Sequence, residues 1–246
     1  IREFFSVNKL NLNKKTNNTI YKNMNFDNLF RTFNSDKASK FLINGKEISG
    51  HNYSPYYEKY LQKYKDKQNL NILEIGSLRG AATASFFHYF EKPKIICADI
   101  NPFQLQVFSP NIRSIYVNTQ SLKTLKNLND YLNQKFDIII DDGSHNIRDQ
   151  IITFNVFFNQ LNKDGLYIIE DSSQYLSALH LNPDNLDYGA KEILLSLKNN
   201  NLDKIKYLTD IDINILNKMI KDIYLEKGNF IENKINISEI IFIEKN

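Results

Sequence analysis

Short apolar runs alternate with amphipathic segments along most of this chain. The runs at residues 71–75, 94–98, 114–117, 136–140 and 166–169 have the length and apolar content of buried strands. Apolar residues at helical spacing occupy residues 53–64, 81–90, 122–134 and 149–161. Strands that alternate with helices in this way predict an α/β fold, with a Rossmann-like, doubly wound, mostly parallel sheet.

The two ends of the chain depart from this alternation. Residues 25–31 predict a short helix, and residues 34–50 have the composition of a loop. Towards the C-terminus we expect a helix at 211–224 and a last strand at 239–244, paired with another near 230–235. This C-terminal antiparallel strand pair would complete a seven-stranded sheet.

Composition narrows the class of protein. A chain of 246 residues with 42% hydrophobic residues can bury one large core, and few glycines and prolines interrupt it. The formal charge of +3 is too small to imply nucleic acid as a partner. The single cysteine, Cys97, excludes an internal disulfide, and no apolar run approaches the ~20 residues that span a bilayer. We therefore expect a cytoplasmic protein.

A glycine turn follows the first expected strand. Glu74, Gly76 and Gly80 lie at this turn, and Asp99 ends the next strand. The spacing is not the G-x-G-x-x-G of dinucleotide binders, but a carboxylate after the second strand is placed to bind ribose hydroxyls. The alternative is a tight structural turn with a surface aspartate.

Carboxylates also follow the fourth and fifth expected strands. Asp141, Asp142 and His145 come after one strand, and Glu170 and Asp171 come after the other. Because the carboxyl ends of parallel strands share one edge of a sheet, these groups could hold a hard divalent cation beside a general base. Alternatively, the aspartates cap the next helix and the histidine is structural.

These residues together resemble the class I S-adenosylmethionine-dependent methyltransferases. The resemblance covers residues 70–171 and implies that the cofactor is S-adenosylmethionine. The implied cofactor-binding residues are Glu74, Gly76, Ser77, Gly80, Asp99, Asn118, Gln120 and Ser121, with Asp141 beside them in a structural or supporting role.

The carboxylate clusters are similar to those of the metal-dependent sugar O-methyltransferases that act on macrolide sugars, a family that includes sequences labelled cephalosporin hydroxylases. Residues 35–37, 51–58 and 241–245 also resemble segments of that family, whereas residues 174–208 depart from it. The resemblance implies Mg²⁺, or Mn²⁺, bound by Asp142, Glu170 and Asp171. It also implies catalysis by Asp142 and His145, with His145 as general base, and a substrate site with His51, Tyr53 and Tyr57.

The expected activity is therefore metal-dependent O-methylation of a sugar hydroxyl. The asparagine-, lysine- and isoleucine-rich composition is typical of an AT-rich bacterial genome, which favours a nucleotide-linked sugar or a precursor of a surface polysaccharide such as capsule. A catechol-like or other small hydroxylated acceptor is the alternative. An iron-dependent hydroxylase would need a second histidine in the cluster.

The same resemblance divides the chain into three parts. Residues 1–23 form an arm of unknown role, residues 24–69 a helical and loop cap near the acceptor site, and residues 70–246 the methyltransferase domain. A homo-oligomer is compatible with this sequence, and neither nucleic acid nor a membrane span is expected.

Overall fold

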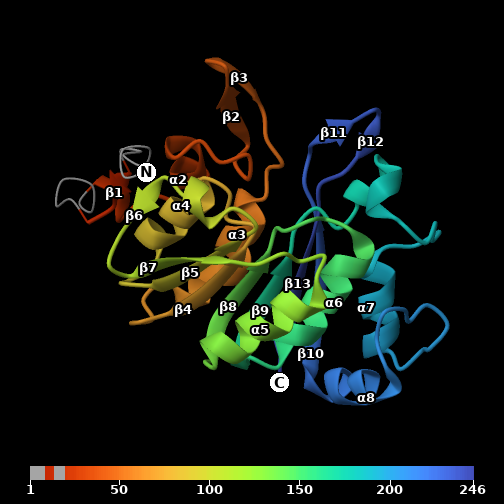
Figure 1. The fold of residues 1–246 in the computed structure, drawn as a ribbon. Coiled ribbons are helices and arrows are strands. Elements are labelled where there is room, and N and C mark those ends of the chain that lie inside the picture. The colour runs from red at the N-terminus through yellow and green to blue at the C-terminus, as the bar shows by residue number, and fades with distance from the viewer. Residues whose placement is uncertain (1–8, 14–19) are drawn as a thin grey trace, which may run out of the picture.

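A seven-stranded sheet forms the centre of the computed structural model, which describes residues 9–13 and 20–246 (Figure 1). The strand order is β10-β13-β9-β8-β4-β5-β7. Only β13 runs antiparallel to its neighbours, which are β9 and β10. The expected mostly parallel sheet with a C-terminal antiparallel pair is confirmed. The bounds are β4 Asn71–Ile75, β5 Lys94–Asp99, β7 Ile112–Tyr116, β8 Phe136–Asp141, β9 Leu161–Ile169, β10 Ile220–Lys227 and β13 Glu239–Lys245.

Helices cover both faces of this sheet. One core lies under α2, α3 and α4, and a second lies under α5, α6, α7 and α8. Alternation along the strands supplies both cores: Ile72 and Ile138 face the first, whereas Leu73 and Ile139 face the second. The bounds are α2 Phe26–Thr32, α3 Ser54–Leu61, α4 Ala81–Tyr89, α5 Leu122–Leu132, α6 Ile147–Phe158, α7 Ala190–Lys198 and α8 Asp210–Met219, with 3-10 turns at Gln62–Tyr64, Pro102–Gln104, Gln174–Leu176 and Leu179–Leu181.

The strand order reverses at the middle of the sheet. After β4 the chain adds β5 and β7 on one side and then returns to place β8 on the other. In open α/β sheets, ligands bind in the crevice outside the carboxyl ends of the strands at such a switch point. The glycine turn after β4 and the carboxylates after β8 both lie there.

The segment expected to be a loop at 34–50 contains a β-hairpin instead. Strand β2, Lys40–Ile43, pairs with β3, Lys46–Ser49, and the hairpin projects from the body of the molecule (Figure 1). Asn44 and Gly45 connect them with φ of 50° and 76°. An Asn-Gly pair with positive φ at both residues is the usual two-residue hairpin turn, a signal that the loop interpretation missed.

The C-terminal prediction was wrong in its details. The helix expected at 211–224 ends at Met219, and the strand that pairs with β13 is β10 rather than residues 230–235. Residues 219, 220, 223 and 224 are apolar at helical spacing, but pairing with β13 covers an exposed sheet edge. Tertiary contacts therefore override the local pattern. A separate hairpin joins β11, Ile231–Glu232, to β12, Ile235–Asn236.

Two smaller differences concern the flanks of the site. Helix α6 spans 147–158 rather than 149–161, because Asn146 caps it and Leu161 already pairs with Phe136 in the sheet. Within the described part of the N-terminal arm, β1, Leu10–Asn11, pairs with β6, Val107–Phe108. Residues 1–8 and 14–19 of the expected arm lie outside the described residues.

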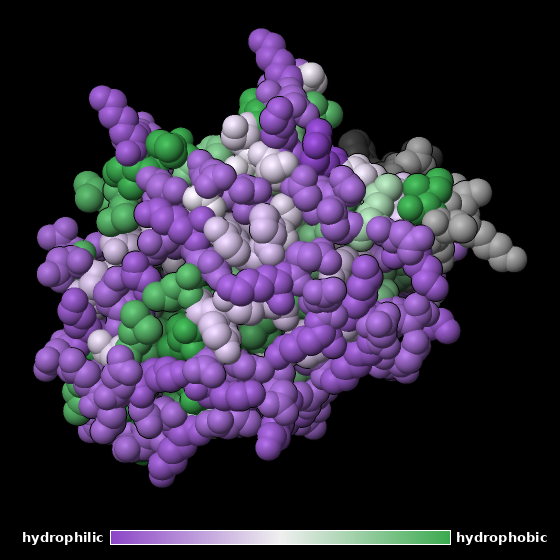
Figure 2. Space-filling model, turned by 180° about the vertical axis from the view of Figure 1, so that it is seen from behind, coloured by the Kyte–Doolittle hydropathy of each residue, from purple (hydrophilic) through white to green (hydrophobic). Residues whose placement is uncertain are grey.

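The surface agrees with a helix-covered sheet whose apolar groups face inward. From behind, it is largely hydrophilic with separate hydrophobic patches (Figure 2). Among the described residues, no helix combines the length and apolar character needed to cross a membrane.

Candidate functional site

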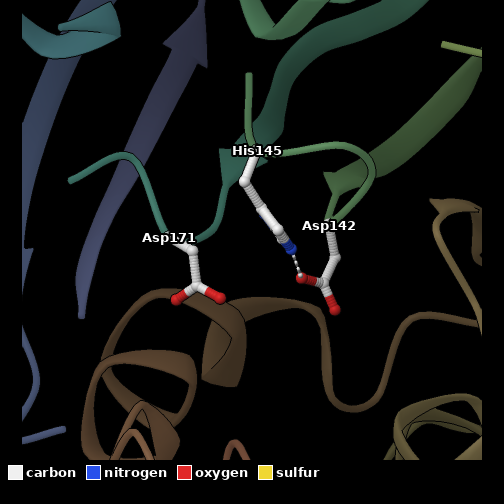
Figure 3. A group of neighbouring side chains, drawn as sticks. All are labelled: Asp142, His145 and Asp171. Carbon is white, nitrogen blue, oxygen red and sulfur yellow. Dashed lines mark ion pairs between the residues drawn. The ribbon is translucent and has the colours of Figure 1, made fainter. Parts of the chain in front are cut away.

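Three side chains meet at the carboxyl ends of β8 and β9 (Figure 3). Asp142, His145 and Asp171 each offer a ligand atom, and these atoms all lie within 4.8 Å of one another. His145 Nε2 lies 3.8 Å from Asp142 Oδ1, which is too long for a hydrogen bond. The imidazole therefore faces the same space as the carboxylates.

The backbone has a positive φ at two of these residues. His145 has φ of 55° and Asp171 has φ of 53°, in the left-handed region that is uncommon for residues other than glycine, although asparagine, aspartate and histidine adopt it more often than the rest. Such conformations cost about 1–3 kcal/mol each and concentrate at functional sites. Next to His145, the Asn146 side chain accepts a hydrogen bond from the backbone N–H of Arg148 and starts α6, which ends the loop after β8.

Glu170 lies beside this cluster but has other partners. The Lys37 ammonium donates to Glu170 Oε2 and to Asp142 Oδ2, at 2.6 Å each. Tyr57 donates its hydroxyl to Glu170 Oε1. In the sequence, Lys37 belongs only to the segment 35–37 that resembles the sugar O-methyltransferase family. No periodicity or spacing links it to Asp142 and Glu170, which lie more than a hundred positions away. Glu170 as a metal ligand stays a prediction.

Asp171 is held from the cap side. Tyr53 donates its hydroxyl to Asp171 Oδ1 at 2.5 Å, and His51 Nδ1 lies 3.0 Å from the same oxygen. His51 Nδ1 is also 2.9 Å from Ser238 Oγ, and its ring stacks on Phe230. The structure thus places all three residues expected at the substrate, His51, Tyr53 and Tyr57, against the carboxylates. Their contact with substrate stays a prediction.

The carboxylates of the cluster lie close together in a buried environment, which changes the pKa of several groups. Burial raises the pKa of Glu170 well above its usual range, repulsion from Asp142 adds to this, and Lys37 only partly opposes it. Burial also acts on Asp171, but the hydrogen bond and charge of His51 hold its pKa at about 2. Burial disfavours charge on Lys37, yet Asp142 and Glu170 raise its pKa well above the ordinary value. Buried carboxylates crowded in this way are suited to a cation, which would reduce their mutual repulsion.

A cavity of about 170 Å³ adjoins the cluster across the switch point. Of the residues expected to bind the cofactor, Gly76, Asp99, Asn118 and Gln120 line it. A second cavity, of about 530 Å³, continues from Gly76 along the glycine turn. Glu74, Ser77 and Gly80 line this second cavity together with Lys37.

Two of the expected cofactor residues line neither cavity. Ser121 caps α5 by accepting a hydrogen bond from the backbone of Thr124. Asp141 is buried, accepts a hydrogen bond from Gly143 N, and burial raises its pKa to about 8. Ser121 and Asp141 thus accept hydrogen bonds from the backbone next to the cavity and stabilise the loops that carry the lining residues.

The glycine turn is fixed by close contacts with its neighbours. Gly76 has φ of 86°, and a Cβ there would overlap the carbonyl oxygen of Asp142. Asp99 Oδ2 accepts a hydrogen bond from Leu78 N at 2.8 Å, and its other oxygen accepts from Asn101 N at 2.8 Å. The turn, the expected ribose carboxylate and the carboxylate cluster therefore form one connected structure.

The donor set fits a hard divalent ion. An oxygen of Asp142 and an oxygen of Asp171 are of the charged type that Mg²⁺ and Mn²⁺ prefer as ligands. Glu170, the third expected metal ligand, would have to give up its contact with Lys37 in order to bind the ion. His145 Nε2 lies close enough either to ligate or to accept a proton.

Comparison with known proteins identifies the class to which this geometry corresponds. The FtsJ-like methyltransferase family matches residues 57–173, which contain the glycine turn, Asp99 and both carboxylate pairs. The chain has the fold of the S-adenosylmethionine-dependent methyltransferases, as its sequence resemblance predicted.

Two curated relatives that match part of the chain are named as O-methyltransferases. The 8-demethyl-8-alpha-L-rhamnosyl tetracenomycin-C 2'-O-methyltransferase of Streptomyces olivaceus is 27% identical over 142 residues, which are 54% of this chain and 37% of that protein. Demethylmacrocin O-methyltransferase of Streptomyces fradiae is 28% identical over 145 residues, covering 56% of this chain and 35% of that one. The expected resemblance to macrolide-sugar enzymes is confirmed.

A solved structure supports the same fold. MycE methyltransferase from the mycinamycin biosynthetic pathway, in complex with Mg, SAH and mycinamycin VI, superposes with a TM-score of 0.65 at 19% identity. The alignment covers 90% of this chain and 54% of MycE. This chain thus spans about half the length of MycE, and its match to each curated relative covers little more than a third of that relative.

Proposed function

We propose that this chain is an S-adenosylmethionine- and divalent-metal-dependent O-methyltransferase that acts on a sugar hydroxyl. One observation carries the proposal: a single loop after β8 serves two sites. Gly143 and Ser144 line the cavity that contains Asp99, whereas Asp142 and His145 belong to the carboxylate cluster. A methyl donor in the cavity and an acceptor at the cluster would therefore both contact this loop.

The cofactor would occupy the cavities along the glycine turn. Asp99 would accept hydrogen bonds from ribose hydroxyls, and Asn118 and Gln120, which line the same cavity, would lie beside the base. Glu74 lies in the neighbouring cavity at the end of β4, where a carboxylate suits the ammonium of the amino-acid part. The relatives' names as methyltransferases and the SAH bound to MycE support this choice of cofactor.

The acceptor side needs activation, because a sugar hydroxyl is hardly ionised at neutral pH. A bound Mg²⁺ or Mn²⁺ would supply Lewis acidity and orient neighbouring hydroxyls. Asp142 and Asp171 would hold the ion, with Glu170 as the third carboxylate. His145 Nε2 would accept the hydroxyl proton, a step that typically contributes about 10²–10⁴-fold. Tyr53, Tyr57 and His51 keep the carboxylates in place through their hydrogen bonds and ion pairing.

The acceptor we propose is a nucleotide-linked sugar or a precursor of a surface polysaccharide in the cytoplasm of a bacterium. The sugar part is supported by the named substrates of the relatives. The division into an arm, a cap at 24–69 and a domain at 70–246 is part of the same proposal. It is supported by the contacts of Lys37, Tyr53 and Tyr57 from the cap to the carboxylates.

The proposal is tested by screening nucleotide-linked sugars with S-adenosylmethionine and Mg²⁺, and reading the mass gain of one methyl group. We expect activity that EDTA removes and that Asp142→Asn abolishes while cofactor binding persists. Asp137→Asn is the matched control, since Asp137 is also a buried aspartate of β8 but binds Lys67 at the opposite end of the strand. Methylation of catechols but not of sugars would contradict the sugar acceptor and favour a catechol-like acceptor instead. Tight NAD binding without any response to S-adenosylmethionine would contradict the whole assignment.

A further inference from the structure

Lys37 is the only lysine or arginine among the buried residues of the described chain. Its ammonium lies between two carboxylates, 2.6 Å from Asp142 Oδ2 and 2.6 Å from Glu170 Oε2. The exposed fraction of its side chain is 5%, so water does not screen these pairs. A buried charge is tolerated only when it is paired. Here the Lys37 ammonium has a carboxylate partner on each side.

The backbone of Lys37 is fixed by the same helix that serves the carboxylates. Its carbonyl oxygen accepts hydrogen bonds from the backbone N–H groups of Tyr53 at 2.9 Å and Ser54 at 3.3 Å, at the start of α3. From this helix, Tyr53 and Tyr57 donate their hydroxyls to Asp171 and Glu170. The backbone of Lys37 and helix α3 therefore approach the carboxylates together.

Lys37 uses specific oxygens and leaves others open. Glu170 has both oxygens engaged, one by Lys37 and one by Tyr57. Asp142 gives Oδ2 to Lys37, while Oδ1 faces His145. A divalent ion can approach Asp142 Oδ1 and Asp171 directly, but it reaches Glu170 Oε2 only where the ammonium now lies.

We propose that Lys37 is the counter-ion of the metal-free site, and that a divalent ion displaces it from Glu170. This inference rests on the proposed metal dependence and adds a positioning residue to it. In the metal-free protein, Lys37 keeps the carboxylates together against their mutual repulsion. On metal binding, the ammonium has space to move, because Lys37 also lines the cavity of about 530 Å³ that contains Asp36 and Glu74.

Mn²⁺ binding followed by electron paramagnetic resonance tests this exchange without any turnover. In Lys37→Met the competing ammonium is absent, so Mn²⁺ should bind about tenfold tighter or more than to the wild type. The variant should also gain more thermal stability from Mn²⁺ than the wild type does. Lys67→Met is the matched control: Lys67 pairs with a buried carboxylate, Asp137, at 2.7 Å, but away from the cluster, and its loss should leave Mn²⁺ affinity unchanged.

The outcomes separate this inference from the proposed function. A wild-type protein that binds no Mn²⁺ contradicts the metal dependence itself. Wild-type binding with equal or weaker affinity in folded Lys37→Met overturns the role of Lys37 alone. If Lys37→Met does not fold, Lys37→Gln is used, with the same expectation. Independently, reductive methylation of wild-type lysines, read by peptide mass spectrometry, should label Lys37 more strongly with saturating Mn²⁺, and unchanged labelling overturns the displacement.

Discussion

Glu74 is a buried acid at the end of β4, and replacing it with glutamine should change how stability depends on pH. Burial raises the pKa of Glu74 to about 7, with Thr83 and Lys37 partly opposing the shift. The folded protein therefore holds a proton on Glu74 that the unfolded chain releases near its ordinary value of 4.5. Stability is then lost as pH rises from about 4.5 to about 7, and the loss is complete above that range.

The size of this effect follows from the two pKa values. One pKa unit corresponds to about 1.4 kcal/mol, so ionised Glu74 costs the metal-free, cofactor-free protein up to about 3 kcal/mol at pH values above about 7. Glu74→Gln keeps an oxygen that can accept the hydrogen bond from the Thr83 hydroxyl, but it carries no charge. The variant should therefore match the wild type in stability near pH 5 and exceed it by about 1–3 kcal/mol near pH 8.5.

Urea unfolding of both proteins between about pH 5 and about pH 8.5 measures the difference directly. The other titrating groups are common to both proteins, so their contributions cancel when one free energy of unfolding is subtracted from the other. A difference that stays constant across this pH range would refute the reasoning, because Glu74 would then have the same pKa in the folded and unfolded states. The variant should also bind S-adenosylhomocysteine more weakly if Glu74 contacts the cofactor.

Other residues give equally specific expectations. Gly76→Ala should abolish cofactor binding in calorimetry, whereas Gly45→Ala, also at positive φ but with no atom within 4 Å of its added Cβ, should cost only about 1 kcal/mol in a thermal melt. His145→Ala should lower kcat by about 10²-fold with Mn²⁺ affinity retained, and a loss of Mn²⁺ affinity instead would make His145 a ligand. Tyr57→Phe leaves the buried Glu170 oxygen without its donor and should lower the free energy of unfolding by about 1–3 kcal/mol in urea, and a smaller change would indicate that water replaces the hydroxyl.

The central sheet could be predicted because its strands are buried on both faces. Strands β4 and β8 are mostly apolar, and each is followed by the turn residues that end it. The predicted seven-stranded sheet was therefore correct, and both carboxylate pairs lie at the ends of strands as predicted. The edge strand β10 was harder to predict than the central strands. Its residues alternate too weakly between apolar and polar to indicate a strand, and its partner in the sheet, β13, lies more than ten positions further along the chain. Local patterns carry no information about such a distant partner.

The site was predictable to a similar extent. Asp142, His145 and Asp171 stand next to strand ends, and the structure brings their ligand atoms together. The side chains that contact Asp142 and Asp171 from outside the cluster come from the first quarter of the chain. The described part of that segment has no strand in the central sheet, so the strand pattern could not place its residues relative to the cluster. Lys37 and Tyr57 reach the cluster only because α2 and α3 pack on the sheet through a shared aromatic core.

The loop after β8 should make the two halves of the proposed site depend on each other. Gly76 packs against the carbonyl of Asp142, so the glycine turn of the cofactor side fixes the backbone of the acceptor side. Asp142 in turn shares Lys37 with Glu170, and Lys37 lines the cavity that continues along the same glycine turn. A change in charge at the carboxylates would therefore be transmitted to the proposed cofactor cavity through Lys37. Cofactor affinity should respond to Mn²⁺ in the wild type and respond less in Lys37→Met, because reciprocal coupling requires an element that both ligands affect.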